Sequence, residues 1–270
     1  MKTPISYYGG KQRLVPEILL LIPKHTQYVE PFCGGAAVFW AKPPSQHEVI
    51  NDLDGRVVNF YRVLQTRFIE LQTMIRGTLH SEAEYYRAKA VLQDGQAPAL
   101  DRAWAFWVQT NMSFSKKLFA GFAFDNGLTS ASVARKRNEF TGYQERLEPA
   151  EIFSRDAVEL IKLKDSPTTF FYIDPPYVSS ECGHYKGYTS ADFQRLLDTL
   201  AALQGKFLLS SYPEPELLAM RAAHGWQVKD IEATVAVSGK RKERKAKTEC
   251  LTWNYSLQEE PFGLFAMAGN

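Results

Sequence analysis

Apolar residues recur along the chain in two rhythms, short runs typical of buried strands and longer stretches typical of helices. The two alternate at both ends of the sequence. Strands that alternate with helices predict an α/β fold with a mostly parallel, doubly wound sheet. We predict strands at 27–32, 48–52, 168–173 and 206–212, a strand and helix within 150–161, a hairpin of 226–238 with 248–255, and helices at 16–22, 36–42, 55–65, 190–203 and 215–225.

The strand pattern is absent between residues 56 and 140. Helical stretches replace it at 68–79, 82–93 and 100–111, and an aromatic, glycine-containing loop follows at 112–128. We interpret 56–140 as a mostly helical subdomain inserted into a discontinuous α/β domain of residues 1–55 and 141–255. Residues 256–270 are expected to form a loose C-terminal tail.

Composition is typical of a soluble globular protein. Of the 270 residues, 45% are hydrophobic and 23% are charged, and apolar runs such as that at 18–22 are far too short to span a bilayer. Cys33, Cys182 and Cys250 form no CxxC pair, which argues against a disulfide framework and a zinc cluster. We expect a cytoplasmic monomer with no signal peptide, membrane partner or metal.

Positive charge is clustered locally, since the net charge is only +2. The segment KRKERKAK at 240–247 contains six basic residues and one acid, and smaller clusters lie at 116–117 and 135–137. Such density suits contacts with nucleic-acid phosphates. A solvated hairpin loop is the alternative interpretation of 240–247.

The strand at 168–173 runs directly into Asp174, Pro175, Pro176 and Tyr177. Neither proline can donate to a strand ladder, so the strand ends at Asp174 and the next residues are held extended. Open α/β sheets bind ligands at the carboxyl ends of their strands. We therefore expect this acid, a free carbonyl and the aromatic ring to meet a ligand.

The strand at 27–32 breaks into a glycine turn and a helix start. Small residues there let the backbone approach a nucleoside, and the first N–H groups of a helix lack partners. A purely structural turn is the alternative. The residues expected to line this turn are Glu30, Pro31, Phe32, Gly34 and Gly35.

A carboxylate follows the next strand, about twenty residues beyond the glycines. Asp52 ends that strand and can accept both hydroxyls of a ribose. Asp54 is the competing acid, and its alternative role is to cap the following helix.

Five segments carry a family resemblance: SYYGGK, YVEPFCGGAAVF, VINDLD, YIDPPY and ECLTWNY. Their order resembles that of the Dam-like (D12 class) adenine-N6 DNA methyltransferases, at both ends of the chain more than in the middle. The resemblance implies S-adenosyl-L-methionine as cofactor, a Rossmann-like methyltransferase sheet, and 56–140 as the target-recognition subdomain. The family's second glycine often falls one place later, where this chain has Ala36.

The resemblance also implies roles for individual residues. Tyr7 and Lys11 would lie over the cofactor, where an aromatic face suits the sulfonium and the lysine can meet a carboxylate or backbone carbonyl. Asp156 would accept from the amino group of the cofactor's adenine, with a helix cap as the equal alternative. Asp174 would belong to both the cofactor site and the catalytic site.

The strand-ending motif suits transfer to an exocyclic amine. Asp174 and the Pro175 carbonyl would accept the two hydrogens of adenine N6 and aim its lone pair at the methyl group. Tyr177 would stack on an adenine rotated out of the duplex, which needs an aromatic face and no hydroxyl. Transfer would be a direct displacement without a covalent enzyme intermediate.

Contacts with double-stranded DNA are expected from three parts of the chain. They are the aromatic loop and its neighbours, the segment after the Pro-Pro-Tyr motif, and the basic segment 240–247. The candidate residues are Asn111, Lys116, Lys117, Phe122, Arg135, Tyr185, Tyr188, Lys240, Arg241, Lys242 and Arg244.

Other functions remain open at this point. The same chemistry on RNA is one, and a DNA-binding protein with an inactive methyltransferase fold is another. A protein-glutamine methyltransferase normally begins the Pro-Pro-Tyr motif with Asn, so Asp174 speaks against it. The target sequence, and a phage, restriction-modification or housekeeping role, are left undecided.

Overall fold

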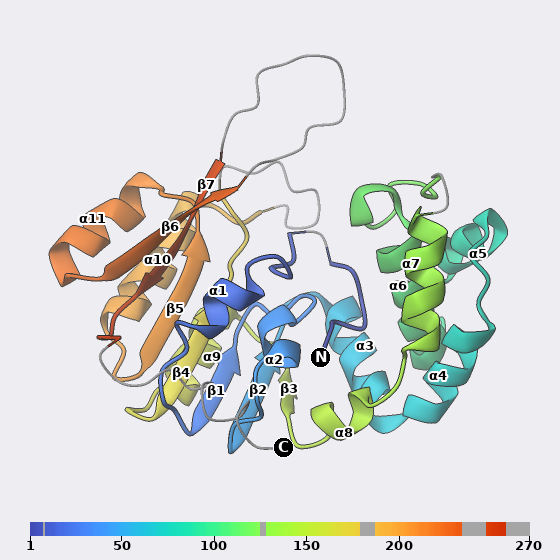
Figure 1. Ribbon diagram of the computed structural model, residues 1–270, viewed down its shortest axis with the longest axis horizontal. Coiled ribbons are helices and arrows are strands. Elements are labelled where there is room, and N and C mark those ends of the chain that lie inside the picture. The colour runs from blue at the N-terminus through green and yellow to red at the C-terminus, as the bar shows by residue number, and fades with distance from the viewer. Residues whose placement is uncertain (8, 125–127, 179–186, 234–246, 258–270) are drawn as a thin grey trace, which may run out of the picture. The chain divides into compact units, whose positions relative to one another are not determined.

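Seven strands form one mixed sheet in the order β3-β2-β1-β4-β5-β7-β6 (Figure 1). The structure, a computed structural model, describes residues 1–7, 9–124, 128–178, 187–233 and 247–257. The strands are β1 (Gln27–Glu30), β2 (His47–Asn51), β3 (Glu151–Phe153), β4 (Thr169–Ile173), β5 (Lys206–Ser211), β6 (Gln227–Ala233) and β7 (Lys247–Trp253).

The strand directions confirm the predicted fold class. β1, β4 and β5 run parallel, as do β2 and β3, whereas β7 is antiparallel to both β5 and β6. The result is a mostly parallel, Rossmann-like sheet with a C-terminal hairpin. All five residues of β4 are buried, as expected of an apolar strand in the middle of a parallel sheet. β4 ends at Ile173, so the Asp-Pro-Pro-Tyr motif begins immediately at its carboxyl end.

The chain divides into two compact units. The first contains Met1–Val15 and Cys33–Asp156, and the second contains Pro16–Phe32 and Ala157–Asn270. The predicted insertion, 56–140, falls inside the first unit. The predicted domain boundaries at 55/56, 140/141 and 255/256 stay a prediction.

Helices dominate the first unit. Helix α6 contacts α3, α4, α5 and α7, and every residue from Ala103 to Met112 is buried, so α6 is the core of this helical region. The hydrophobic pattern does not predict α7, because its polar sequence lacks an apolar stripe. The helices are α2 (Ala37–Ala41), α3 (Gly55–Thr66), α4 (Phe68–Gly77), α5 (Glu82–Gln93), α6 (Ala99–Met112), the 3-10 turn η1 (Phe114–Lys116), α7 (Leu128–Asn138) and α8 (Tyr143–Leu147).

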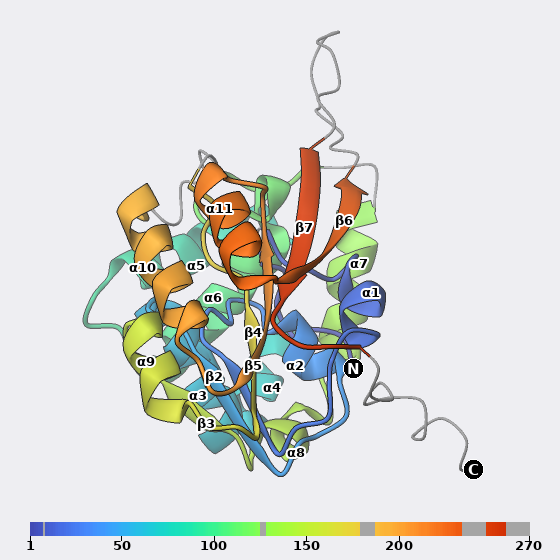
Figure 2. The ribbon, with the colours of Figure 1, turned by 90° about the vertical axis from the view of Figure 1, so that its left-hand side faces the viewer.

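In the second unit, α9 (Ala157–Lys164), α10 (Ser190–Ala201) and α11 (Pro215–His224) lie on one side of β4 and β5 (Figure 2). α10 contacts both of its neighbours and begins with a capping box formed by Thr189 and Asp192. The short helix α1 (Val15–Leu19) starts next to Pro16, as predicted.

Two of the three cysteines fall within the described residues. Cys33 and Cys250 are buried free thiols, and Cys182 lies outside the described part of the chain. Among the helices that the structure describes, none combines the length and apolar character needed to cross a bilayer.

Candidate active site

The glycine turn after β1 is held by hydrogen bonds on both sides of one residue. The N–H of Gly34 donates to Asp52 Oδ2 at 2.8 Å, and the buried Tyr61 hydroxyl donates to the Gly34 carbonyl at 3.1 Å. Gly34 has a φ of +45°, and a Cβ there would lie 2.9 Å from Cδ1 of Tyr7. Glycine is therefore required both for the backbone shape and for the close approach of the Tyr7 ring.

Ala36 explains how the chain departs from the usual glycine spacing. It has φ 50° and ψ 44°, the left-handed conformation that glycine favours, and it precedes helix α2. The backbone therefore keeps the shape that a glycine would adopt, at the cost of strain on one alanine.

Asp52 occupies the centre of this turn. It is 3% exposed, and its Oδ1 accepts from the N–H of Asp54 at 2.8 Å. Burial raises the pKa of the Asp52 carboxyl to about 6, although the N–H groups of Asp54 and Gly34 act in the opposite direction. A carboxylate has about four acceptor sites, and backbone N–H groups, including that of Leu53, use three of them, so acceptor capacity is left for a ligand hydroxyl.

Asp54 is engaged elsewhere. Its carboxylate accepts from the backbone N–H of Arg56 at 2.9 Å, which caps α3, and pairs with the Arg56 guanidinium at 2.7 Å. The geometry therefore favours Asp52 over Asp54 as the acid of a ligand site.

Asn51 connects the end of β2 to the segment that carries Asp156. Its amide donates to the Arg155 carbonyl at 3.1 Å and accepts from the Arg155 N–H at 2.9 Å. Asn51 is 1% exposed, and its own carbonyl accepts from Cys33 at 2.8 Å. Asn51 is not among the site residues predicted from the sequence, although its position beside Asp52 at the end of an apolar strand could have indicated it.

Lys11, predicted beside the cofactor, is buried in the same unit. Its ammonium donates to the Gly9 carbonyl at 3.2 Å, one of the two kinds of partner expected for it. Gly35 lies next to the same aromatic residue as Gly34, since a Cβ at Gly35 would be 3.1 Å from Cβ of Tyr7.

In the second unit, the Tyr177 hydroxyl is fixed at the carboxyl end of the sheet. It donates to Glu249 Oε1 at 2.7 Å, and the Ser210 hydroxyl donates to the same oxygen at 2.7 Å. The Tyr177 ring lies 4.3 Å from the ring of Tyr212, centroid to centroid. Burial, followed by the charges of Asp174 and Glu249, raises the pKa of Tyr177 well above its usual value, so the hydroxyl remains a donor.

These three partners come from elements that converge on the motif. Ser210 lies near the end of β5, Tyr212 directly follows that strand, and Glu249 belongs to β7, whose Cys250 pairs with Ser211. None of the three is among the site residues predicted from the sequence, although Glu249 lies in the segment ECLTWNY, one of the five that carry the resemblance. Asp174 itself is half-buried, and Pro175 is buried.

Three further residues predicted near the cofactor lie at the end of β1 and directly after it. Glu30 is 2% exposed and accepts from the Tyr28 hydroxyl at 2.7 Å. Phe32 meets Tyr188, a predicted DNA contact, edge to face with ring centroids 6.4 Å apart. Pro31, which stands between Glu30 and Phe32 in the sequence, is buried.

The aromatic loop after α6 carries unusual backbone conformations. Ser115, Lys116 and Phe119 all have positive φ values, of 53°, 58° and 64°. Such angles are uncommon outside glycine and mark candidate functional segments. Phe114 is 56% exposed and Phe124 76% exposed, so they, more than Phe122, present aromatic surface.

Phe122 and Asn111 lie deeper than expected for direct DNA contacts. Phe122 is half-buried, with its ring 4.8 Å from His80 and 6.0 Å from Tyr85. Asn111 is 1% exposed, and its amide donates to the Trp107 carbonyl at 2.9 Å.

Among the cations, Lys117 is half-buried and Arg135 is exposed on α7. The predictions for Tyr185, Lys240, Arg241, Lys242 and Arg244 lie outside the described residues.

A Rossmann-like sheet with a glycine turn after β1 and Asp-Pro-Pro-Tyr after β4 defines an α/β methyltransferase. A family model described as D12 class N6 adenine-specific DNA methyltransferase matches residues 7–218, and the chain belongs to this family. It is therefore an adenine-specific DNA methyltransferase that uses a methyl donor of the S-adenosylmethionine type, as the resemblance implied.

The chain is also similar to individual proteins. The chain is 27% identical to a type II methyltransferase, M1.LlaDCHI, of Lactococcus lactis subsp. cremoris, over 93% of this chain and 94% of that protein. It is 24% identical to the DNA N-6-adenine-methyltransferase of Escherichia phage P1, over 87% of this chain but only 33% of that longer protein. A solved precorrin-6y C5,15-methyltransferase from Geobacter metallireducens aligns with a TM-score of 0.42 and 9% identity, over 90% and 86% of the two chains.

Proposed function

We propose that the chain transfers a methyl group from S-adenosylmethionine to N6 of an adenine rotated out of double-stranded DNA, with Asp174 and Tyr177 at the reacting base. The observation that carries this proposal is the motif itself. A buried central strand ends in an acid, two prolines and a tyrosine whose hydroxyl is already fixed by Glu249. Little ordering is then needed when the base arrives.

The first unit would bind the methyl donor. Asp52 would accept from the ribose hydroxyls with its remaining acceptor capacity, and Gly34 would let the nucleoside approach the backbone closely. Tyr7 lies over this turn and would offer its ring to the sulfonium. Asp156, beside the Arg155 backbone that Asn51 holds, would accept from the adenine amino group of the donor.

When bound, the donor supplies an electrophilic methyl group on a sulfonium. Asp174 and the Pro175 carbonyl would accept the two hydrogens of the target amine, which directs its lone pair toward that methyl carbon. The new nitrogen–carbon bond would form as the sulfur–carbon bond breaks, and the amine would then lose one proton. Tyr177 would hold the base by stacking.

Tyr177 needs a fixed ring plane for this role. Glu249 fixes one end of the ring through the hydroxyl, and Tyr212 packs against it at an interplanar angle of 50°. Glu249 and Ser210 would therefore act as positioning residues for the stacking face.

DNA contacts would come from the aromatic loop and the basic segments. The exposed Phe114 and Phe124 suit wedging between base steps, and Lys117 and Arg135 suit phosphates. The segment 240–247 lies mostly outside the described residues. Replacing several of its cations by Ala should make the fall of log affinity with log salt less steep, by about 0.9 for each phosphate that the protein no longer neutralises. An unchanged slope would favour a solvated loop.

Asp174→Ala tests the proposal. We expect a loss of turnover of about 10²–10³-fold or more, because an acceptor aimed at the reacting amine is removed, with DNA affinity nearly unchanged. Asp198→Ala, which removes an exposed carboxylate from α10, is the matched control. Turnover within a few-fold of the unchanged chain would reject the role of Asp174.

The product separates the alternatives. Nucleoside mass spectrometry after incubation with duplex DNA and with RNA should find N6-methyladenine in the DNA. Methylation of RNA alone would favour the RNA alternative, and DNA binding without methylation would favour an inactive relative.

A further inference from the structure

Two lysines from different segments of the first unit meet at one buried asparagine. The Lys136 ammonium, on α7, donates to Asn111 Oδ1 at 2.8 Å and to the Ser6 hydroxyl at 2.7 Å. The Lys116 ammonium, in the aromatic loop, donates to the Asn111 backbone carbonyl at 2.9 Å. Asn111 therefore brings two cations together with the N-terminal segment.

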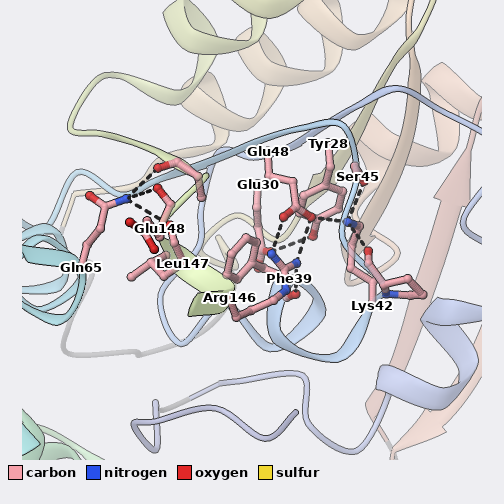
Figure 3. A network of polar contacts seen from close by, with 12 residues as sticks. Tyr28, Glu30, Phe39, Lys42, Ser45, Glu48, Gln65, Arg146, Leu147 and Glu148 are labelled. Carbon is pink, nitrogen blue, oxygen red and sulfur yellow. Dashed lines mark hydrogen bonds and ion pairs between the residues drawn. The ribbon is translucent and has the colours of Figure 1, made fainter. Parts of the chain in front are cut away.

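The buried Lys42, in the same unit, shows how an internal ammonium is usually balanced (Figure 3). Lys42 forms an ion pair with the buried carboxylate of Glu48, which also pairs with Arg146, and it donates to Ser45 Oγ at 2.7 Å. The Lys42 ammonium thus has a carboxylate as well as neutral oxygens for partners, so we assign this cluster a structural role.

Lys136 differs, because within the described residues both of its hydrogen bonds go to neutral oxygens. Two of its three ammonium hydrogens are used in these bonds. The charges that act on it, those of Lys116, Arg135 and Lys2, are all positive. Burial is the larger cause and these charges are the smaller one, and together they lower the pKa of Lys136 to about 7.

A partly buried group of like charges is unfavourable unless an anion joins it. A phosphate would supply both the negative charge and an acceptor for the third ammonium hydrogen of Lys136. We propose that Lys136 and Lys116, held in place by Asn111 and Ser6, bind a phosphate of the DNA backbone. This inference rests on the proposed action on double-stranded DNA, and it gives the buried Asn111 a positioning role in place of a direct contact.

Variants at Lys136 distinguish a phosphate-binding role from a purely structural role, in which Lys136 only links Asn111 to Ser6. Binding of a mixed-sequence duplex, without cofactor, should weaken about tenfold in Lys136→Met, with a salt slope smaller by about 0.9. Lys136→Arg keeps its charge at every pH tested, so it should restore most of the affinity. Lys162→Met, on the exposed side of α9, should change neither quantity.

The pH dependence of DNA affinity supplies a second test, because a purely structural role of Lys136 would not produce it. A free-state pKa of about 7 means that affinity of the unchanged chain should fall about tenfold from pH 6 to pH 8. Lys136→Arg should bind equally at both values. This comparison needs only the unchanged chain and Lys136→Arg, so it tests the inference even if Lys136→Met fails to fold.

Three results would overturn the inference. One is a duplex affinity and salt slope of folded Lys136→Met equal to those of the unchanged chain. Another is equal pH dependence in the unchanged chain and Lys136→Arg. The third is weaker binding of S-adenosylmethionine alone in Lys136→Met with unchanged DNA binding, which would assign the site to the cofactor's carboxylate. Failure of the unchanged chain to bind or methylate DNA would instead reject the proposed function.

Discussion

Asp52 and Lys136 are two ionisable groups in the same unit, one in the glycine turn and one beside the aromatic loop, and their surroundings differ in kind. Asp52 is a carboxylate whose oxygens each accept a backbone N–H, from Gly34 and Asp54. Lys136 is an ammonium that donates to neutral oxygens of Asn111 and Ser6, while its neighbouring charges have its own sign. The negative charge of Asp52 is stabilised by N–H donors, whereas the positive charge of Lys136 is destabilised by neighbouring positive charges.

The difference follows from the ligand proposed for each group. A ribose is neutral, so the acid that binds it needs enough N–H donors to remain ionised, even though burial moves its pKa to about 6. A phosphate brings its own charge, so the cations that bind it gain their counter-charge on binding. The two environments therefore predict opposite responses to pH.

A third polar group, Glu249, extends the comparison to the second unit and gives the largest expected effect. Its Oε1 accepts from the Tyr177 and Ser210 hydroxyls. Tyr177→Ala should reduce turnover about 100-fold, since base stacking is worth about 1–3 kcal/mol and ring order is lost as well. Tyr177→Phe keeps the aromatic face and should recover most of the turnover, measured at saturating donor and DNA.

A double-mutant cycle shows what the hydroxyl contributes. Glu249→Gln should lower turnover in the unchanged chain no more than Tyr177→Phe does, and it should have little further effect in the Tyr177→Phe background, because the shared hydrogen bond is already absent. Asp230→Asn, a change on β6, is the control. A Phe variant as slow as the Ala variant would show that the hydroxyl, and not the ring, carries the function.

Asp52→Ala should have the next largest effect. Loss of a charge-assisted hydrogen bond costs about 1.5–3 kcal/mol, so S-adenosylmethionine affinity measured by calorimetry should fall at least tenfold. Asp54→Ala should destabilise the start of α3 by about 1 kcal/mol and leave that affinity nearly unchanged. The reverse result would assign the ribose to Asp54.

Lys136 should also make the free energy of unfolding of the ligand-free protein depend on pH. Its folded-state pKa of about 7 lies below the ordinary value of 10.5, so the folded state binds fewer protons than the unfolded state between these values. The free energy of unfolding should therefore rise with pH from about 7 to 10.5. Lys136→Met should lack this rise in denaturant titrations, and an identical pH profile in both proteins would contradict the assigned pKa.

Ala36→Gly gives the smallest expected effect. Relief of the left-handed alanine should raise the free energy of unfolding by about 1 kcal/mol, and the cofactor turn should keep its affinity. A destabilised Gly variant would mean that the methyl group of the buried Ala36 contributes more by packing than its backbone strain costs.

Much of the fold follows from local patterns in the sequence. The apolar runs of β4 and β5 and the Pro-Pro stop after β4 are properties of short segments, so periodicity and proline chemistry predict them. Helix α7 could not be predicted this way, since contacts with α4 and α6, and not an apolar stripe, accompany it.

The residues of the candidate site likewise differ in whether the local sequence reveals their role. Asp52 and Tyr177 were recognisable because their chemistry appears in contiguous motifs. Glu249 and Lys136 act through partners far away in sequence, Tyr177 and Ser6, that only the folded chain brings within hydrogen-bond distance. Asn111 was assigned to DNA from the sequence, but its burial inside α6 depends on helix packing that no local pattern specifies.

The most direct test measures two affinities of one protein preparation between pH 5 and pH 9. Binding of S-adenosylmethionine without DNA should weaken as pH falls through about 6, where Asp52 becomes protonated. Binding of a mixed-sequence duplex without cofactor should weaken as pH rises through about 7, where Lys136 loses its proton. Opposite slopes that disappear separately in Asp52→Ala and Lys136→Arg are the predicted result, and slopes of the same sign, or slopes unaffected by these variants, would contradict it.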